Sequence, residues 1–336
     1  MNNERIVYID ALKGFAILLV VMGHTITKLY SQSFEHMLWD YPTSTMFWWY
    51  VIYSFHMPLF MFISGFLFCR TDGYQWKSAL ITVWKRAYTL LLPFVVWALI
   101  TRYVFHSPWE LWFLRSLFTF VLLTLLWEIP RRYITNRWLA LICDLLVYAG
   151  SWWALKHTVR LFPMSVQTII DFRPDMYLFF CFGILFKRYK GDKIINRGWV
   201  FTLTTLLSII LFYCNLQHFT IIPYQSIVMP LCAVLSVWYV FENTTNVNSK
   251  WGGYWVRIGK YTLEIYILHT FFSFHLPWIG EPIIQLAQSG IIFGASTLQL
   301  VSSLLLSMIT IEISIVARNI ISKSKTLLLL LCGRLI

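Results

Sequence analysis

The chain has 336 residues, of which 58% are apolar and 12% are charged. A typical soluble domain is about 45–50% apolar and about 25% charged, so the composition argues against a soluble domain. The formal net charge of +12 would suggest a nucleic-acid partner in a soluble protein. Here the basic residues are explained by membrane topology, and no nucleic-acid partner is expected.

About ten hydrophobic segments approach the length of about 20 residues that a helix needs to cross a bilayer. Lipid-facing backbone must satisfy its own hydrogen bonds, which favours helices. The first segment lacks a small-residue cleavage site and is expected to be retained. The sequence therefore predicts an all-α, polytopic transmembrane helical bundle, with residues 1–336 as a single domain and no soluble appendage. In chain order the segments are residues 9–29, 46–69, 87–105, 110–128, 138–155, 176–187, 199–217, 222–241, 261–278 and 290–317.

Lys and Arg are concentrated at the N-terminus and in every second loop. The positive-inside rule places these loops in the cytoplasm. An even number of spans then leaves both termini on the cytoplasmic side. The basic groups are Arg5; Arg70, Lys77, Lys85 and Arg86; Arg131, Arg132 and Arg137; Lys187, Arg188, Lys190, Lys193 and Arg197; Lys250, Arg257 and Lys260; and Arg318, Lys323, Lys325 and Arg334.

The chain has six cysteines, none of them in a C-x-x-C pair. Most lie in or beside apolar segments, where cysteine behaves as a small core residue. We therefore expect neither disulfides nor a metal site from them. They are Cys69, Cys143, Cys181, Cys214, Cys232 and Cys332.

The first segment carries three ionisable residues, Asp10, Lys13 and His24. Ionisable residues inside spans are rare and are functional candidates by default. At about 100° per residue, Lys13 and His24 lie within about 20° of one face, separated by about 16 Å along the axis. Asp10 and Lys13 are spaced to pair on the helix surface. The alternative is a charge pair near a helix end and a hydrogen-bonded His24 at the interface.

Later segments also contain ionisable residues. The second contains His56 before Pro58, which bends a helix, and then Ser64 and Gly65, which allow close packing. His56 alone is equally compatible with a structural role. The fourth has Arg115 one turn inside, and an intramembrane arginine needs a partner or water.

The ninth segment contains Glu264 and His269 inside the apolar stretch. Both are intramembrane ionisable groups of the kind that mark functional sites. Tyr266 lies between them and is equally compatible with an anchor at the membrane interface.

Taken in order, these residues resemble the membrane acyltransferase-3 family, which comprises bacterial, multi-spanning O-acyltransferases of surface glycans. The family motif of a basic residue, ten intervening residues and a histidine matches Lys13 and His24. The matching segments extend from residue 5 to residue 269, so the resemblance covers nearly the whole chain. The other matches are Phe55 to Phe60 with Ser64 and Gly65, then Trp112-Phe113-Leu114, and finally Gly259 to His269.

The resemblance implies transfer of an acetyl group from acetyl-CoA to a hydroxyl of a glycan or lipid-linked saccharide, at the bacterial inner membrane. A histidine can act as general base or can carry the acyl group itself. We expect His24 to have one of these roles, without a metal. The other catalytic candidates are Asp10 and His56; the donor-phosphate candidates are Lys13, Arg115, Arg86 and Lys260; the acceptor candidates are Ser64, Trp112, Glu264, Tyr266 and His269.

Two other classes are compatible with parts of the sequence. A proton-coupled transporter would also place Asp, Lys, His and Glu inside spans. Transporters often show internal repeats, which this sequence lacks. A structural subunit of a membrane assembly would not explain the polar stripe of the first segment.

Overall fold

The computed structural model of the protein describes residues 7–29, 47–71, 73–106, 111–158, 161–162, 173–246 and 249–334. The secondary structure of these residues is helical, with no strand, which confirms the all-α prediction. Arg5 lies outside the described ranges. The longer elements are α1 (Val7–Lys28), α3 (Phe47–Phe68), α4 (Trp76–Arg86), η2 (Ala87–Leu91), α5 (Leu92–Tyr103), α6 (Trp112–Arg131), α7 (Arg137–Thr158), α9 (Pro174–Arg188), α10 (Gly191–Ile195), α11 (Gly198–Leu216), α12 (Gln225–Thr244), α13 (Lys250–Lys260), α14 (Thr262–Leu268), η4 (His269–Phe271), α15 (Pro277–Gln288), α16 (Ile292–Ile321) and α17 (Lys325–Cys332).

Eight helices in the described ranges are long and apolar enough to cross a membrane. One of them, Trp76–Tyr103, runs through α4, the π-helical turn η2 and α5 without a break, and begins earlier than predicted. Two expected spans are not among the eight. The sixth corresponds to α9, which has 15 residues, and the ninth is broken at His269 after the short helix α14.

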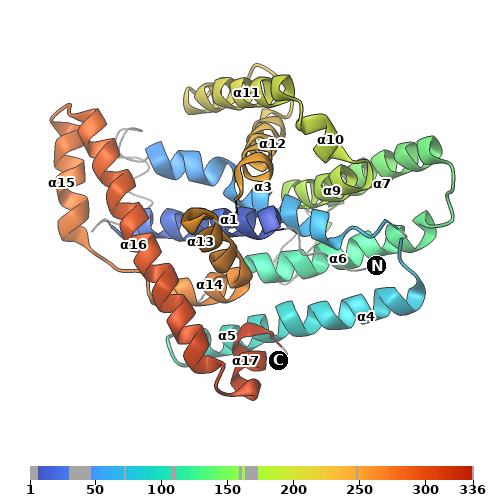
Figure 1. Ribbon diagram of the computed structural model, residues 1–336, viewed down its shortest axis with the longest axis horizontal. Coiled ribbons are helices and arrows are strands. Elements are labelled where there is room, and N and C mark those ends of the chain that lie inside the picture. The colour runs from blue at the N-terminus through green and yellow to red at the C-terminus, as the bar shows by residue number, and fades with distance from the viewer. Residues whose placement is uncertain are drawn as a thin grey trace. The chain divides into compact units, whose positions relative to one another are not determined.

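The chain divides into two compact units, and Figure 1 labels their helices. The first comprises Met1–Phe60 and Ile195–Ile320, and the second comprises Met61–Ile194 and Ile321–Ile336.

Helix α1 is the central element of the first unit, and most of its residues are buried. Helix α13 crosses it, as Figure 1 shows, and one glycine of each helix lies at the contact. A Cβ atom on Gly14 would overlap the carbonyl oxygen of Trp255, and one on Gly259 would overlap that of Asp10. Small residues are what allow two helix backbones to approach this closely. This contact fixes the segment that leads from α13 into α14.

The second unit contains a similar contact between the C-terminal half of α3 and α9. A Cβ atom on Gly65 would overlap the carbonyl oxygen of Phe180, and one on Gly183 would overlap that of Phe62. The C-terminal helix α17 packs against α5, where the indole Nε1 of Trp97 donates to the carbonyl of Leu331 at 2.8 Å.

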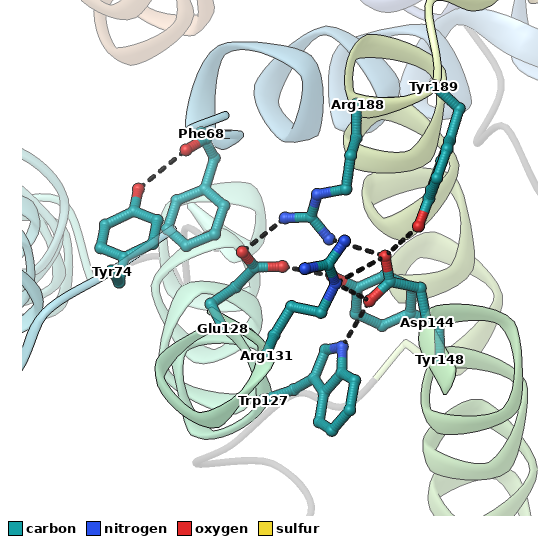
Figure 2. A network of polar contacts seen from close by, with 9 residues as sticks. All are labelled: Phe68, Tyr74, Trp127, Glu128, Arg131, Asp144, Tyr148, Arg188 and Tyr189. Atoms are coloured by element: carbon teal, nitrogen blue, oxygen red, sulfur yellow. Dashed lines mark hydrogen bonds and ion pairs between the residues drawn. The ribbon is translucent and has the colours of Figure 1, made fainter. Parts of the chain in front are cut away.

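A buried ion network joins α6, α7 and α9 in the second unit (Figure 2). The guanidinium of Arg188 contacts Glu128 Oε2 at 2.5 Å and Asp144 Oδ2 at 3.0 Å. Arg131 Nε donates to Asp144 Oδ1 at 3.0 Å. Both carboxylates are fully buried, at 0% exposure. Further donors to these carboxylates are Trp127, Tyr148 and Tyr189.

All six cysteines lie in the described ranges, and none of them forms a disulfide there. Cys69, Cys181, Cys232 and Cys332 are buried. They pack as small apolar side chains.

Candidate active site

His24 and His269 lie side by side in the first unit. His24 is in the penultimate turn of α1, and His269 begins η4, directly after α14. Their ring centroids are 5.2 Å apart and the ring planes are inclined by 49°. His269 is 2% exposed, whereas His24 is half-buried. The contact therefore brings a buried imidazole beside a partly accessible one.

The hydrogen bonds of His269 fix its tautomer. Its Nδ1 lies 3.0 Å from the carbonyl oxygen of Ile265 and 2.9 Å from that of Tyr266. Carbonyl oxygens only accept hydrogen bonds, so Nδ1 carries the proton and Nε2 has a lone pair. Within the described part of the chain, this buried Nε2 has no hydrogen-bond partner. A free basic nitrogen is thus held in the histidine pair.

His56 has the same arrangement on α3. Its Nδ1 lies 2.7 Å from the carbonyl oxygen of Ile52, which again leaves Nε2 unprotonated in the neutral ring. The ring of Tyr53 packs edge-on against His56, with centroids 4.8 Å apart. A Cβ atom on Gly23 would lie 2.7 Å from the same tyrosine ring. Tyr53 therefore lies between His56 and the turn of α1 that carries His24.

Lys28 adds a cationic group at this end of α1. It lies one turn after His24, and its Nζ donates to the carbonyl oxygen of Thr270 at 3.1 Å. Lys28 was not among the site residues predicted from the sequence. Its spacing of four residues from His24 is the available signal, since such residues share a helix face.

The predicted pair of Asp10 and Lys13 is confirmed at the other end of α1. Lys13 Nζ lies 2.7 Å from Asp10 Oδ1, and Asp10 is buried. About 16 Å of helix separates Lys13 from His24. The cationic end and the histidine end of the stripe are therefore distinct places on one helix.

Three further candidates lie near the C-terminal part of the first unit. Glu264 is buried, and its Oε1 lies 3.8 Å from Arg318 Nε. The ring of Tyr266 lies 6.1 Å from that of His269. Lys260 is exposed at the end of α13. Of these three, Tyr266 is the residue whose ring contacts the histidine pair.

Four candidates belong to the second unit. Arg115 lies over the ring of Phe94 at 5.4 Å. Trp112, at the start of α6, is covered by the guanidinium of Arg173 at 4.0 Å. The other two are Ser64, which precedes the contact glycine of α3, and Arg86, which precedes the π-helical turn.

The described residues contain no group of three or more His, Cys, Asp or Glu side chains that could hold a metal ion. The three histidines instead offer unprotonated nitrogens on adjacent elements. Such a set is suited to proton transfer and to nucleophilic attack.

Sequence comparison with known proteins identifies one matching family model and two relatives. A family model described as "Acyltransferase domain" matches residues 6–317. The chain is 30% identical to Nodulation protein NolL of Mesorhizobium japonicum over 225 residues, which cover 64% of this chain and 57% of the relative. It is 28% identical to Nodulation protein NolL of Sinorhizobium fredii over 214 residues, covering 55% and 50% respectively. The chain thus spans about half the length of these relatives. No solved structure matches it.

Proposed function

Because the chain belongs to the acyltransferase family that matches residues 6–317, we propose that it is a membrane O-acyltransferase. It moves an acetyl group from acetyl-CoA to a hydroxyl of a glycan or lipid-linked saccharide. The enzyme is a multi-pass protein of the bacterial inner membrane with both termini in the cytoplasm. With α9 and the α14 segment crossing in addition to the eight candidate spans, the distribution of basic loops supports this placement.

The main structural support for this proposal is the contact between His24 and His269. Transfer to a hydroxyl needs a base for the hydroxyl proton and a donor for the developing oxyanion. His24 takes the proton as the acceptor oxygen attacks the thioester carbonyl. CoA leaves as the thiolate and is protonated by the imidazolium. Lys28, one turn away, supplies positive charge on the same side of the site.

A covalent route uses the same residues. The imidazole of His24 attacks the thioester carbonyl and the C–S bond breaks. The acylated ring then gives its remaining N–H proton to the departing CoA thiolate, which leaves a neutral acyl-imidazole and free CoA. The acceptor hydroxyl then attacks this intermediate and gives its proton to the unprotonated Nε2 of His269 or His56. That proton passes on to the departing ring nitrogen, which restores the neutral His24. Release of CoA before the acceptor is added distinguishes this route from direct transfer.

The donor phosphates are assigned to cationic side chains. Lys13 is the candidate in α1, and buried Asp10 holds its ammonium in place. Arg115 and Arg86 in the second unit, and Lys260 at the end of α13, are the other candidates. Arginine provides a planar fork for phosphate oxygens and lysine provides a point charge.

The remaining candidates are assigned to the acceptor. His56 positions a hydroxyl or relays its proton, while Tyr266 and His269 line the histidine end of the site. Ser64 and Trp112, which belong to the second unit, stay predictions from the sequence. Glu264 acts through its ion pair with Arg318, so we assign it a positioning role.

The deciding experiment uses purified protein in lipid nanodiscs with radiolabelled acetyl-CoA. His24→Ala should abolish acetyl transfer and leave the acetyl-CoA-induced rise in melting temperature unchanged. Retained turnover in this variant would overturn the role of His24. Failure of millimolar acetyl-CoA to raise the melting temperature of folded wild-type protein would overturn the donor assignment. The family match favours this function over proton-coupled transport.

A further inference from the structure

A pocket with a volume of about 340 Å³ lies between α3, α11 and α12 in the first unit. It is separate from the predicted site residues, since none of them lines it. Its size is at the lower end of small-molecule sites, which are roughly 300–1,000 Å³. The lining residues include Tyr53, Ser54, Phe212, Asn215, His218 and Ser226.

Polar groups of the pocket are fixed and have capacity left for a ligand. The buried side chain of Gln225 donates from Nε2 to Asn215 Oδ1 at 2.6 Å and to the carbonyl of Phe219 at 3.0 Å. Because its oxygen is already an acceptor, Asn215 presents its amide NH2 as the remaining donor. Ser54 donates to the carbonyl of Val51 and keeps lone pairs free to accept.

Aromatic side chains form the rest of the wall. Tyr50, Tyr53 and Phe212 all line the pocket. The ring of Tyr53 is stacked on Trp49, with centroids 4.1 Å apart, which holds it rigidly. Flat aromatic surfaces combined with amide, hydroxyl and imidazole groups suit a sugar ring, which has apolar C–H faces and a rim of hydroxyls. An aliphatic lipid chain would leave these polar groups without partners.

Tyr53 connects this pocket to the histidines. The same ring that lines the pocket packs edge-on against His56 and over Gly23, the residue before His24. A ligand resting on the pocket face of Tyr53 therefore lies one aromatic ring away from the candidate catalytic groups.

The distribution of Lys and Arg indicates on which side of the membrane the pocket lies. The pocket lies at the C-terminal end of α11 and the N-terminal end of α12. The connection between these helices, residues 217–224, contains no Lys or Arg. The other end of α11 follows the basic residues Lys190, Lys193 and Arg197. The positive-inside rule places the basic end in the cytoplasm and the pocket at the outer side.

We propose that the pocket between α3, α11 and α12 binds the saccharide acceptor from the outer side of the membrane. Asn215, His218 and Ser226 bind sugar hydroxyls, and Tyr53 orients one hydroxyl toward His24. This inference rests on the proposed acyltransferase function. It adds the place, the membrane side and the residues of acceptor recognition.

The test uses Ser226→Trp, which fills the pocket. Its control is Thr202→Trp, at an exposed position of α11 outside the pocket. Both proteins are placed in nanodiscs free of glycoside detergents. The acceptor probes are the methyl glycosides of glucose, galactose and N-acetylglucosamine, with labelled acetyl-CoA. Ser226→Trp should raise the KM for an accepted glycoside at least about tenfold, a loss of roughly 1.4 kcal/mol in binding, while the control keeps the wild-type KM.

The melting shift produced by acetyl-CoA distinguishes failure of the acceptor-site proposal from failure of the acyltransferase proposal. Both variants should keep the melting shift produced by acetyl-CoA. A wild-type glycoside KM in Ser226→Trp overturns the acceptor site, as does a wild-type protein that binds acetyl-CoA but neither acetylates nor is stabilised by any of the three glycosides. Loss of the acetyl-CoA shift in the wild type overturns the acyltransferase proposal instead. If Ser226→Trp does not fold, Phe212→Ala and Asn215→Ala must raise the KM without altering the donor shift.

Discussion

The ring of His269 lies 5.2 Å from that of His24. Its Nδ1 is bonded to backbone carbonyls, and its Nε2 has no hydrogen-bond partner among the residues that the structure describes. Because α14 ends at Leu268, His269 also closes its last helical turn. The side chain thus combines a structural bond on one nitrogen with a basic site on the other. These two contributions can be separated by substitution.

His269→Asn and His269→Ala form a matched pair for this purpose. The asparagine amide can still donate to the carbonyl of Ile265, but it has no counterpart of Nε2. If Nε2 takes a proton during transfer, both variants should lose about 10²–10⁴ in kcat, the usual contribution of a general base. If His269→Asn keeps the wild-type kcat and His269→Ala does not, the residue acts only through its hydrogen bond to the backbone carbonyl. Melting temperature serves as the folding control.

Lys13 provides a prediction about donor binding. A ligand present at 100 times its dissociation constant adds about 2.7 kcal/mol of stability, which is visible as a melting shift. Lys13→Ala should reduce the shift produced by acetyl-CoA, because a cation near the phosphates is lost. Lys323→Ala, outside the candidate site, should leave the shift unchanged. Equal shifts in the wild type and Lys13→Ala would remove Lys13 from the donor site.

Local relationships were the ones that the sequence could predict. The pairing of Asp10 and Lys13 follows from a spacing of three residues on one helix, and the structure confirms it. The all-helical architecture follows similarly from hydrophobic segments. Helix spacing cannot reveal that His269 packs against His24, since this depends on how α14 is placed against α1. The family motifs named both residues without giving their contact.

Two features were missed for the same reason. Glu128 and Asp144 lie within apolar segments, which was a signal, but their partner Arg188 comes from another helix. Basic loop residues were explained by topology, and Arg188 shows that such a residue can also bind buried carboxylates. In the sequence, Tyr53 is not distinguishable from other aromatic residues near the end of a predicted span. Its place between His56 and the pocket is visible only in the fold.

The contact between α1 and α13 predicts that Gly259 does not tolerate a methyl group. A Cβ atom there would overlap the carbonyl oxygen of Asp10, which is backbone and cannot rotate away. Gly259→Ala should therefore cost about 1–3 kcal/mol of stability, the usual cost of overpacking. The matched control is Gly150→Ala in α7, because nothing lies within 4 Å of a Cβ at that position. A lower melting temperature in the control than in Gly259→Ala would contradict this account.

The ion network of Figure 2 gives the strongest stability prediction. Arg188 is the residue that binds both Glu128 and Asp144, and these carboxylates are fully buried. Arg188→Ala leaves buried charge uncompensated, which typically costs about 3–5 kcal/mol. Arg188→Lys should rescue little, since a point charge cannot reproduce the planar fork that reaches two carboxylates. Melting temperatures in nanodiscs measure both variants against Arg197→Ala, an exposed arginine from the same basic group. If the charge of Arg188 served only to orient the chain in the membrane, Arg188→Lys would match the wild type, and the network would have no role in stability.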